Sequence, residues 1–141
     1  MLKILVPVDG SAFGEKAIAH VLKLHRQSAQ IEVHLLNVQI PVESGHVRMF
    51  VEHDTLEDYY REEGFAALKG ARAALDAAGV PCQVHIAVGH VADTILRYAK
   101  EKGFDKIVMG THGRTALMQA LLGSIAEEVL QHASVPVTLV K

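Results

Sequence analysis

Short apolar runs alternate along the chain with longer segments in which apolar residues recur every three or four positions. The short runs are rich in β-branched residues and predict five strands, at about residues 2–8, 31–38, 82–88, 105–110 and 135–140. The longer segments predict four helices, at about residues 14–27, 55–78, 91–102 and 124–132. This alternation is typical of an α/β domain built on a parallel sheet.

Glycine and proline mark the connections between these segments. The second helix ends just before Gly79, and the third ends at Gly103. Residues 40–54 predict an irregular connection after the second strand. Within the second helix, Gly64 and Gly70 would each reduce helix stability by up to ~1 kcal/mol relative to alanine.

Composition indicates one globular domain over residues 1–141, because half of the residues are hydrophobic and no repeat or linker divides the chain. The formal net charge is −2, and neither sign forms a block that would indicate nucleic acid or a membrane surface as a partner. Cys82 is the one cysteine, so no intrachain disulfide forms. The first strand starts at Leu2, which leaves no room for a signal peptide. We expect a soluble, cytoplasmic protein.

In open parallel sheets, ligands bind beyond the carboxyl ends of the strands, where neighbouring connections leave on opposite faces. The first strand ends near Asp9, which Gly10 and Ser11 follow. The Asp9 carboxylate can accept hydrogen bonds from a ribose or a base, and Gly10 permits close approach of backbone. The same tripeptide is ordinary turn and helix-cap chemistry, so both interpretations stay open.

The fourth strand ends at Gly110 and leads into a segment with two further glycines, Gly113 and Gly123. Because glycine adopts positive φ and has no side chain, Gly110 and Gly113 predict a nest of backbone N–H groups that binds an anion. Ser124 begins the last helix, whose N-terminal N–H groups and dipole favour a phosphate. A capping box from Ser124 to Glu127 would explain the serine and the glutamate without a ligand, but not the glycines.

Two common site signatures are absent from the sequence. The nearest approach to a Walker A motif, at Gly10, Gly14 and Lys16, has the wrong spacing and lacks the Ser or Thr after the lysine. The nine histidines include no His-x3-His pair and no HExxH motif, so no metal site is expected. His90 and His112 each follow a strand end, and each is either a ligand contact or an exposed loop histidine.

The glycine segment, Gly110-x2-Gly113-x9-Gly123-Ser124, matches the nucleotide-binding signature of universal stress proteins. The opening "ILVPVDGS" resembles the same family, as do "VGHVADTILRYAKEKGFDKIVMGTHGR" and the closing "SVPVTLVK". The resemblance covers essentially the whole chain, and every position of the glycine signature is kept.

This resemblance implies a single open five-stranded parallel sheet in the order 3-2-1-4-5, with helices on both faces. Such a fold is Rossmann-like and similar to that of the adenine nucleotide alpha hydrolases. The order places the switch point between the first and fourth strands, and so brings Asp9 and Gly110 to one crevice. The family is usually dimeric, and the apolar last strand, at the sheet edge, is the expected homodimer contact.

The resemblance also assigns nucleotide-binding residues, which lie at the ends of three strands and in the glycine segment. By position they are Pro7, Val8, Asp9, Val38, Met109, Gly110, Gly113, Arg114, Gly123, Ser124 and Ile125. Asp9 would contact the nucleoside, and the backbone around Val38 would read the adenine edge. Met109 and Gly110 would lie by the ribose, and the signature residues after them would hold the phosphates. Arg114 either adds positive charge there or is a solvated loop arginine.

The favoured function is an ATP-binding stress-response protein that works as a nucleotide-dependent switch on an unknown protein partner, with at most slow hydrolysis. ATP, ADP and AMP remain open as the ligand, and any Mg²⁺ would be held by the phosphates. The alternative is a genuine ATPase or phosphotransferase, which the sequence disfavours because it shows no Walker lysine and no clear catalytic base. A receiver domain would need an aspartate at the end of the third strand, where Val88, Gly89 and His90 stand.

Overall fold

The computed structural model describes residues 1–27, 29–42, 53–113 and 121–141. Its sheet has five parallel strands in the order β3-β2-β1-β4-β5, as the resemblance implied. The strands are β1 (Leu2–Pro7), β2 (Ile31–Gln39), β3 (Cys82–Val88), β4 (Lys106–Gly110) and β5 (Val137–Val140). The helices in the described ranges are α1 (Ala12–Arg26), α3 (His53–Ala77), α4 (Val91–Glu101) and α5 (Ser124–His132). None of these helices is long and apolar enough to cross a bilayer.

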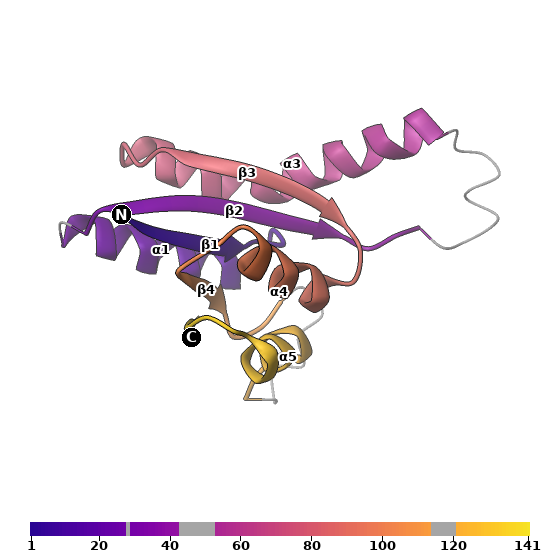
Figure 1. Cartoon of the computed structure of the whole chain (residues 1–141). Coiled ribbons are helices and arrows are strands. Elements are labelled where there is room, and N and C mark those ends of the chain that lie inside the picture. The colour runs from indigo at the N-terminus through magenta and orange to yellow at the C-terminus, as the bar shows by residue number, and fades with distance from the viewer. Residues whose placement is uncertain (28, 43–52, 114–120) are drawn as a thin grey trace.

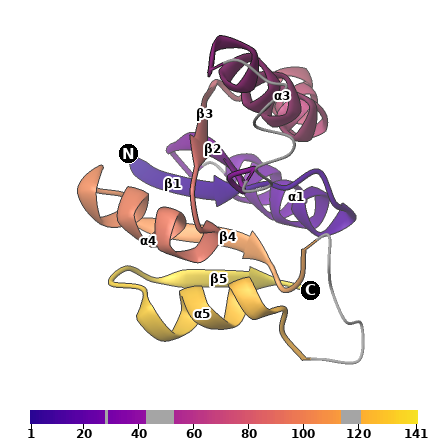
Figure 2. The same ribbon diagram turned by 90° about the vertical axis from the view of Figure 1, so that its right-hand side faces the viewer.

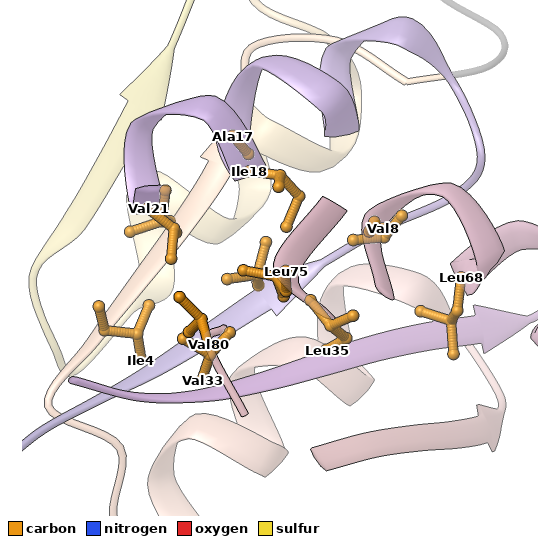
Figure 3. Packing of buried hydrophobic residues seen from close by; sticks show 13 residues of the cluster. Ile4, Val8, Ala17, Ile18, Val21, Val33, Leu35, Leu68, Leu75 and Val80 are labelled. Carbon is orange, nitrogen blue, oxygen red and sulfur yellow. The ribbon is translucent and has the colours of Figure 1, made fainter. Parts of the chain in front are cut away.

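The helices cover both faces of the sheet, with α1 and α3 on one side and α4 and α5 on the other (Figures 1 and 2). Successive strand residues point to opposite faces, so each face has a core of its own. Val33 and Leu35 of β2 pack with Ile18 and Leu75 on the α1 and α3 side, as Figure 3 shows. Leu36, the next residue along β2, packs with α4 residues on the other side. Burial on both faces explains why these strands read as nearly continuous apolar runs.

The predicted elements are all present, and their bounds shift by small amounts. The clearest shift is in β5, which begins at Val137 although the apolar run starts at residue 135. Pro136 has no N–H to donate to the ladder, while its carbonyl still accepts from Ile107 N at 2.9 Å. Similarly, α1 begins at Ala12 because Ser11 already takes the extended conformation of an N-cap residue.

The two glycines inside α3 have different environments, although their helix propensities are the same. A Cβ atom at Gly64 would lie 2.8 Å from both Cδ1 and Cγ2 of Ile86 on β3, whereas a Cβ atom at Gly70 would meet nothing within 4 Å. The absence of a side chain at Gly64 therefore lets α3 approach β3 closely. Both glycines lower helix propensity, but Gly70 has no close neighbour that would explain the missing side chain.

Polar and aromatic side chains form a cluster on the α4 side of the sheet, near the start of β2. His34 Nδ1 lies 2.8 Å from His85 Nε2, and His34 Nε2 lies 2.7 Å from Glu32 Oε2. Phe104 packs edge-on against the His34 ring, and Tyr98 packs edge-on against the His85 ring. The spacing of the histidines in the sequence does not suggest this pairing, which arises because β2 and β3 are neighbours in the sheet.

The surroundings of His85 favour the neutral form of its imidazole. Burial lowers the pKa of its imidazole below the ordinary 6.5, and the nearby His34, Lys102 and Lys3 lower that pKa further. At His85, the unfolded chain therefore binds more protons than the folded chain at pH values just below 6.5. The contribution of His85 to stability is complete above that pH and is lost as the pH falls from the unfolded pKa toward the folded one.

We expect the free energy of unfolding of His85→Gln to fall less than that of the wild type between about pH 7.5 and about pH 5.5, because glutamine does not titrate. Urea unfolding across this range measures the difference. His25→Gln, at an exposed position of α1, is the matched control and should keep the wild-type pH dependence. Parallel curves for the wild type and His85→Gln would contradict the assignment.

Candidate functional site

A cavity of about 680 Å³ lies at the carboxyl ends of β1, β2 and β4, where the strand order reverses. Residues from the starts of α4 and α5, and Tyr59 of α3, complete its wall. Parallel strands end on the same side of the sheet, and the arrowheads of β1 and β2 in Figure 1 mark that side. The cavity is thus at the switch point of the fold, where ligands of α/β proteins bind.

Nearly all the sequence-predicted site residues meet in this cavity. Its lining includes Pro7, Val8, Asp9, Val38, Met109, Gly110, Gly113, Gly123, Ser124 and Ile125. Arg114 lies outside the described residues. Of the two histidines singled out, His112 lines the cavity, whereas His90 is the N-cap residue of α4 and is absent from the lining.

Asp9 serves the turn and faces the cavity at the same time. Its Oδ1 accepts a hydrogen bond from Ser11 N at 2.9 Å, and Gly10 takes the left-handed φ of 86° that the turn requires. Its Oδ2 lies so near Gly113 that a Cβ atom there would be 2.7 Å away. The turn interpretation is right for Asp9. Ser11 is the N-cap residue of α1 by its backbone conformation, but its hydroxyl makes no cap hydrogen bond.

The glycines of the signature allow close packing and do not adopt a special backbone conformation. Gly110, Gly113 and Gly123 all lie outside the left-handed region, so the predicted nest with positive φ is wrong. A Cβ atom at Gly110 would lie 2.7 Å from the carbonyl oxygen of Phe13, which shows how closely β4 approaches α1. A Cβ atom at Gly123 would lie 3.1 Å from His112 Cα.

The start of α5 opens onto the cavity. Gly123 is its N-cap residue and Ser124 its first helical residue, and no side chain caps the helix. The capping box from Ser124 to Glu127, the alternative explanation that needs no ligand, is therefore not formed. Gly123 N donates to Thr111 O at 2.7 Å, which fixes the helix start against the end of β4. The first N–H groups of a helix have no partner within it, so this end presents donors and a positive dipole.

The rest of the cavity combines an apolar floor with two amide side chains. The floor is formed by Leu36, Val38, Val91, Ile95 and Met109.

Asn37 and Gln39, at the end of β2, also line the cavity. Asn37 Nδ2 donates to Val8 O at 2.9 Å, and Gln39 Nε2 donates to Asn37 Oδ1 at 2.6 Å. Sequence reasoning missed both residues. The available signal was two amides at alternate positions in an otherwise apolar strand end.

Charge around the cavity is sparse in the described part of the chain. Asp9 and Glu127 are its acidic lining residues, and no lysine or arginine belongs to the described lining. His112 packs its ring 5.1 Å from that of Phe13, and its Nδ1 lies 3.0 Å from Thr111 Oγ1. Within the described ranges, no three His, Cys, Asp or Glu residues are placed to share a metal ion.

The whole chain, residues 1–141, matches the family model described as "Universal stress protein family". The chain belongs to this family. It is 32% identical to the universal stress protein MJ0531 of Methanocaldococcus jannaschii over 145 residues, which cover 99% of this chain and 81% of that protein.

Solved structures of universal stress proteins share the fold. The structure of MJ0577, also from Methanocaldococcus jannaschii, superposes with a TM-score of 0.84 at 34% identity, covering 99% of this chain and 95% of the other. A universal stress protein in complex with cAMP superposes with a TM-score of 0.74 at 21% identity, covering 99% of this chain and 97% of the other. At this low identity, the similarity to the cAMP complex shows a shared fold.

Proposed function

We propose that this universal stress protein, a single domain over residues 1–141, binds an adenine nucleotide in the cavity and acts in the cytoplasm as a nucleotide-dependent regulator of a stress response. The observation that carries the proposal is that a negatively charged acceptor and a set of backbone N–H donors belong to the same cavity. A carboxylate, that of Asp9, and the uncapped start of α5 both line it. A nucleotide needs an acceptor for its ribose hydroxyls and donors for its phosphates, and this one cavity has both in its lining.

The proposed orientation of the nucleotide follows from the chemistry of the residues that line the cavity. The base lies on the apolar floor, with its edge along the backbone of Val38, and the ribose lies by Asp9, Met109 and Gly110. The phosphates lie at the N–H groups of α5, where the dipole favours negative charge. A volume of about 680 Å³ is within the range that holds molecules of nucleotide size. The cAMP complex of another universal stress protein supports an adenine nucleotide as the ligand.

We expect Gly123→Val to lower the affinity for ATP by at least about tenfold, the equivalent of ~1.4 kcal/mol. The new side chain would push the α5 start away from His112 and Thr111, where a Cβ atom already has only 3.1–3.3 Å. Titration calorimetry measures the affinity, and circular dichroism checks the fold. Gly70→Val adds the same side chain at an open position of α3 and should bind normally. If the folded Gly123→Val protein bound ATP with unchanged affinity, the phosphates could not lie at the start of α5.

Turnover of ATP should be slow, well below the ~10 per second typical of dedicated enzymes. The cavity offers N–H donors to hold phosphates, but the described lining has no cationic side chain to neutralise a leaving group. Single-turnover release of phosphate from radiolabelled ATP with Mg²⁺ measures the rate. Asp9→Asn and Glu127→Gln test the two carboxylates, and Ser124→Ala tests the hydroxyl at the helix start. Fast release that any of these variants abolishes would favour the alternative, a genuine ATPase or phosphotransferase.

We also infer a homodimer through β5, an edge strand whose four residues are all partly exposed and which, among the described strands, pairs only with β4. The carbonyls of Pro136 and Val140 face β4, so the N–H of Val137 faces outward. Val137→Pro should therefore weaken the dimer without breaking the β4–β5 ladder, whereas Thr138→Pro would break the ladder itself. Light scattering at micromolar concentration measures the mass. A monomeric wild type would rule out this interface.

A further inference from the structure

The two amides at the end of β2 form a hydrogen-bonded chain whose direction is fixed at one end. Val8 O is a backbone carbonyl and can only accept, so Asn37 must present its NH₂ group there. The Asn37 oxygen then points to Gln39 and requires a donor, which is the Gln39 NH₂ group at 2.6 Å. The remaining polar atom of Gln39, Oε1, is an acceptor, and no described residue donates a hydrogen bond to it.

This arrangement is held firmly in place. Asn37 is only 3% exposed, so turning its amide would bury two facing oxygens without a proton between them. The backbone is fixed on both sides, because Val8 N donates to Leu36 O and Gly89 N donates to Gln39 O, both at 2.9 Å. Turning the Gln39 amide alone would set its oxygen against that of Asn37. Gln39 therefore offers the cavity a preorganised acceptor.

We propose that Gln39 is a specificity-determining residue that accepts a hydrogen bond from the exocyclic amino group of the base, with Asn37 as its positioning residue. The inference rests on the proposed function and deepens it. A 6-aminopurine presents an N–H donor where a 6-oxopurine presents an oxygen. An oxygen facing Gln39 Oε1 would leave two acceptors unpaired, which costs more than the loss of one hydrogen bond. The cavity therefore selects adenine over hypoxanthine and guanine.

The test compares three triphosphates that differ at one position of the base. ATP has an amino group there, purine riboside triphosphate has hydrogen, and inosine triphosphate has an oxygen. Calorimetric affinities of the wild type should fall in that order, with ATP ahead of purine riboside triphosphate by about fivefold or more. Gln39→Met keeps the length of the side chain without the acceptor. Gln83→Met, the same change at an exposed position of the neighbouring strand β3, is the control.

In Gln39→Met, the preference for ATP over purine riboside triphosphate should shrink by about fivefold, while the affinity for purine riboside triphosphate stays near that of the wild type. Gln83→Met should keep the wild-type ratios. If Gln39 only braced Asn37, its loss would weaken all three ligands equally and leave their ratios unchanged, which would overturn the inference alone. Equal wild-type affinities for ATP and purine riboside triphosphate would overturn it as well. If the wild type bound none of the three, the proposed function would fall, and the inference with it.

Discussion

The pairing of β1 with β2 on one side and with β4 on the other is the constraint on which the remaining structure depends. It places an apolar strand at the centre of the sheet, so that both faces need a layer of helices. It also makes the connections after β1 and β4 leave on opposite faces, and this divergence opens the cavity. The core and the candidate site therefore have the same origin, and the site needs no element beyond those that complete the core.

Sequence reasoning succeeded where a local pattern determines the structure. The alternation of apolar runs and helical periods gave all the described strands and helices, because burial on one or two faces leaves a direct mark on residue spacing. Periodicity says nothing about which strands are neighbours. The strand order, which was also correct, therefore came from the family resemblance and not from the local pattern. The positions of Asp9 and Gly110 in one cavity follow once that order is known.

The failures concern contacts between residues far apart in the sequence. Gly110 and Gly113 were expected to form a nest of N–H groups, but they make room for Phe13 and Asp9, which only the folded chain brings near. The pairing of His34 with His85 and the amide chain from Val8 to Gln39 likewise cross from one strand to the next. Propensity scales describe a residue in its own segment, and they contain no information on such neighbours.

The close approach of α3 to β3 at Gly64 also sets the geometry of the cavity wall. The amino-terminal turns of α3 extend past the end of β3 (Figure 1), and Tyr59, near the start of this helix, lines the cavity. At 1.5 Å per residue, Tyr59 stands about 7.5 Å along the helix from Gly64. A larger residue at position 64 would therefore move this part of α3 away from Ile86 and β3, and would displace Tyr59 in the cavity wall with it.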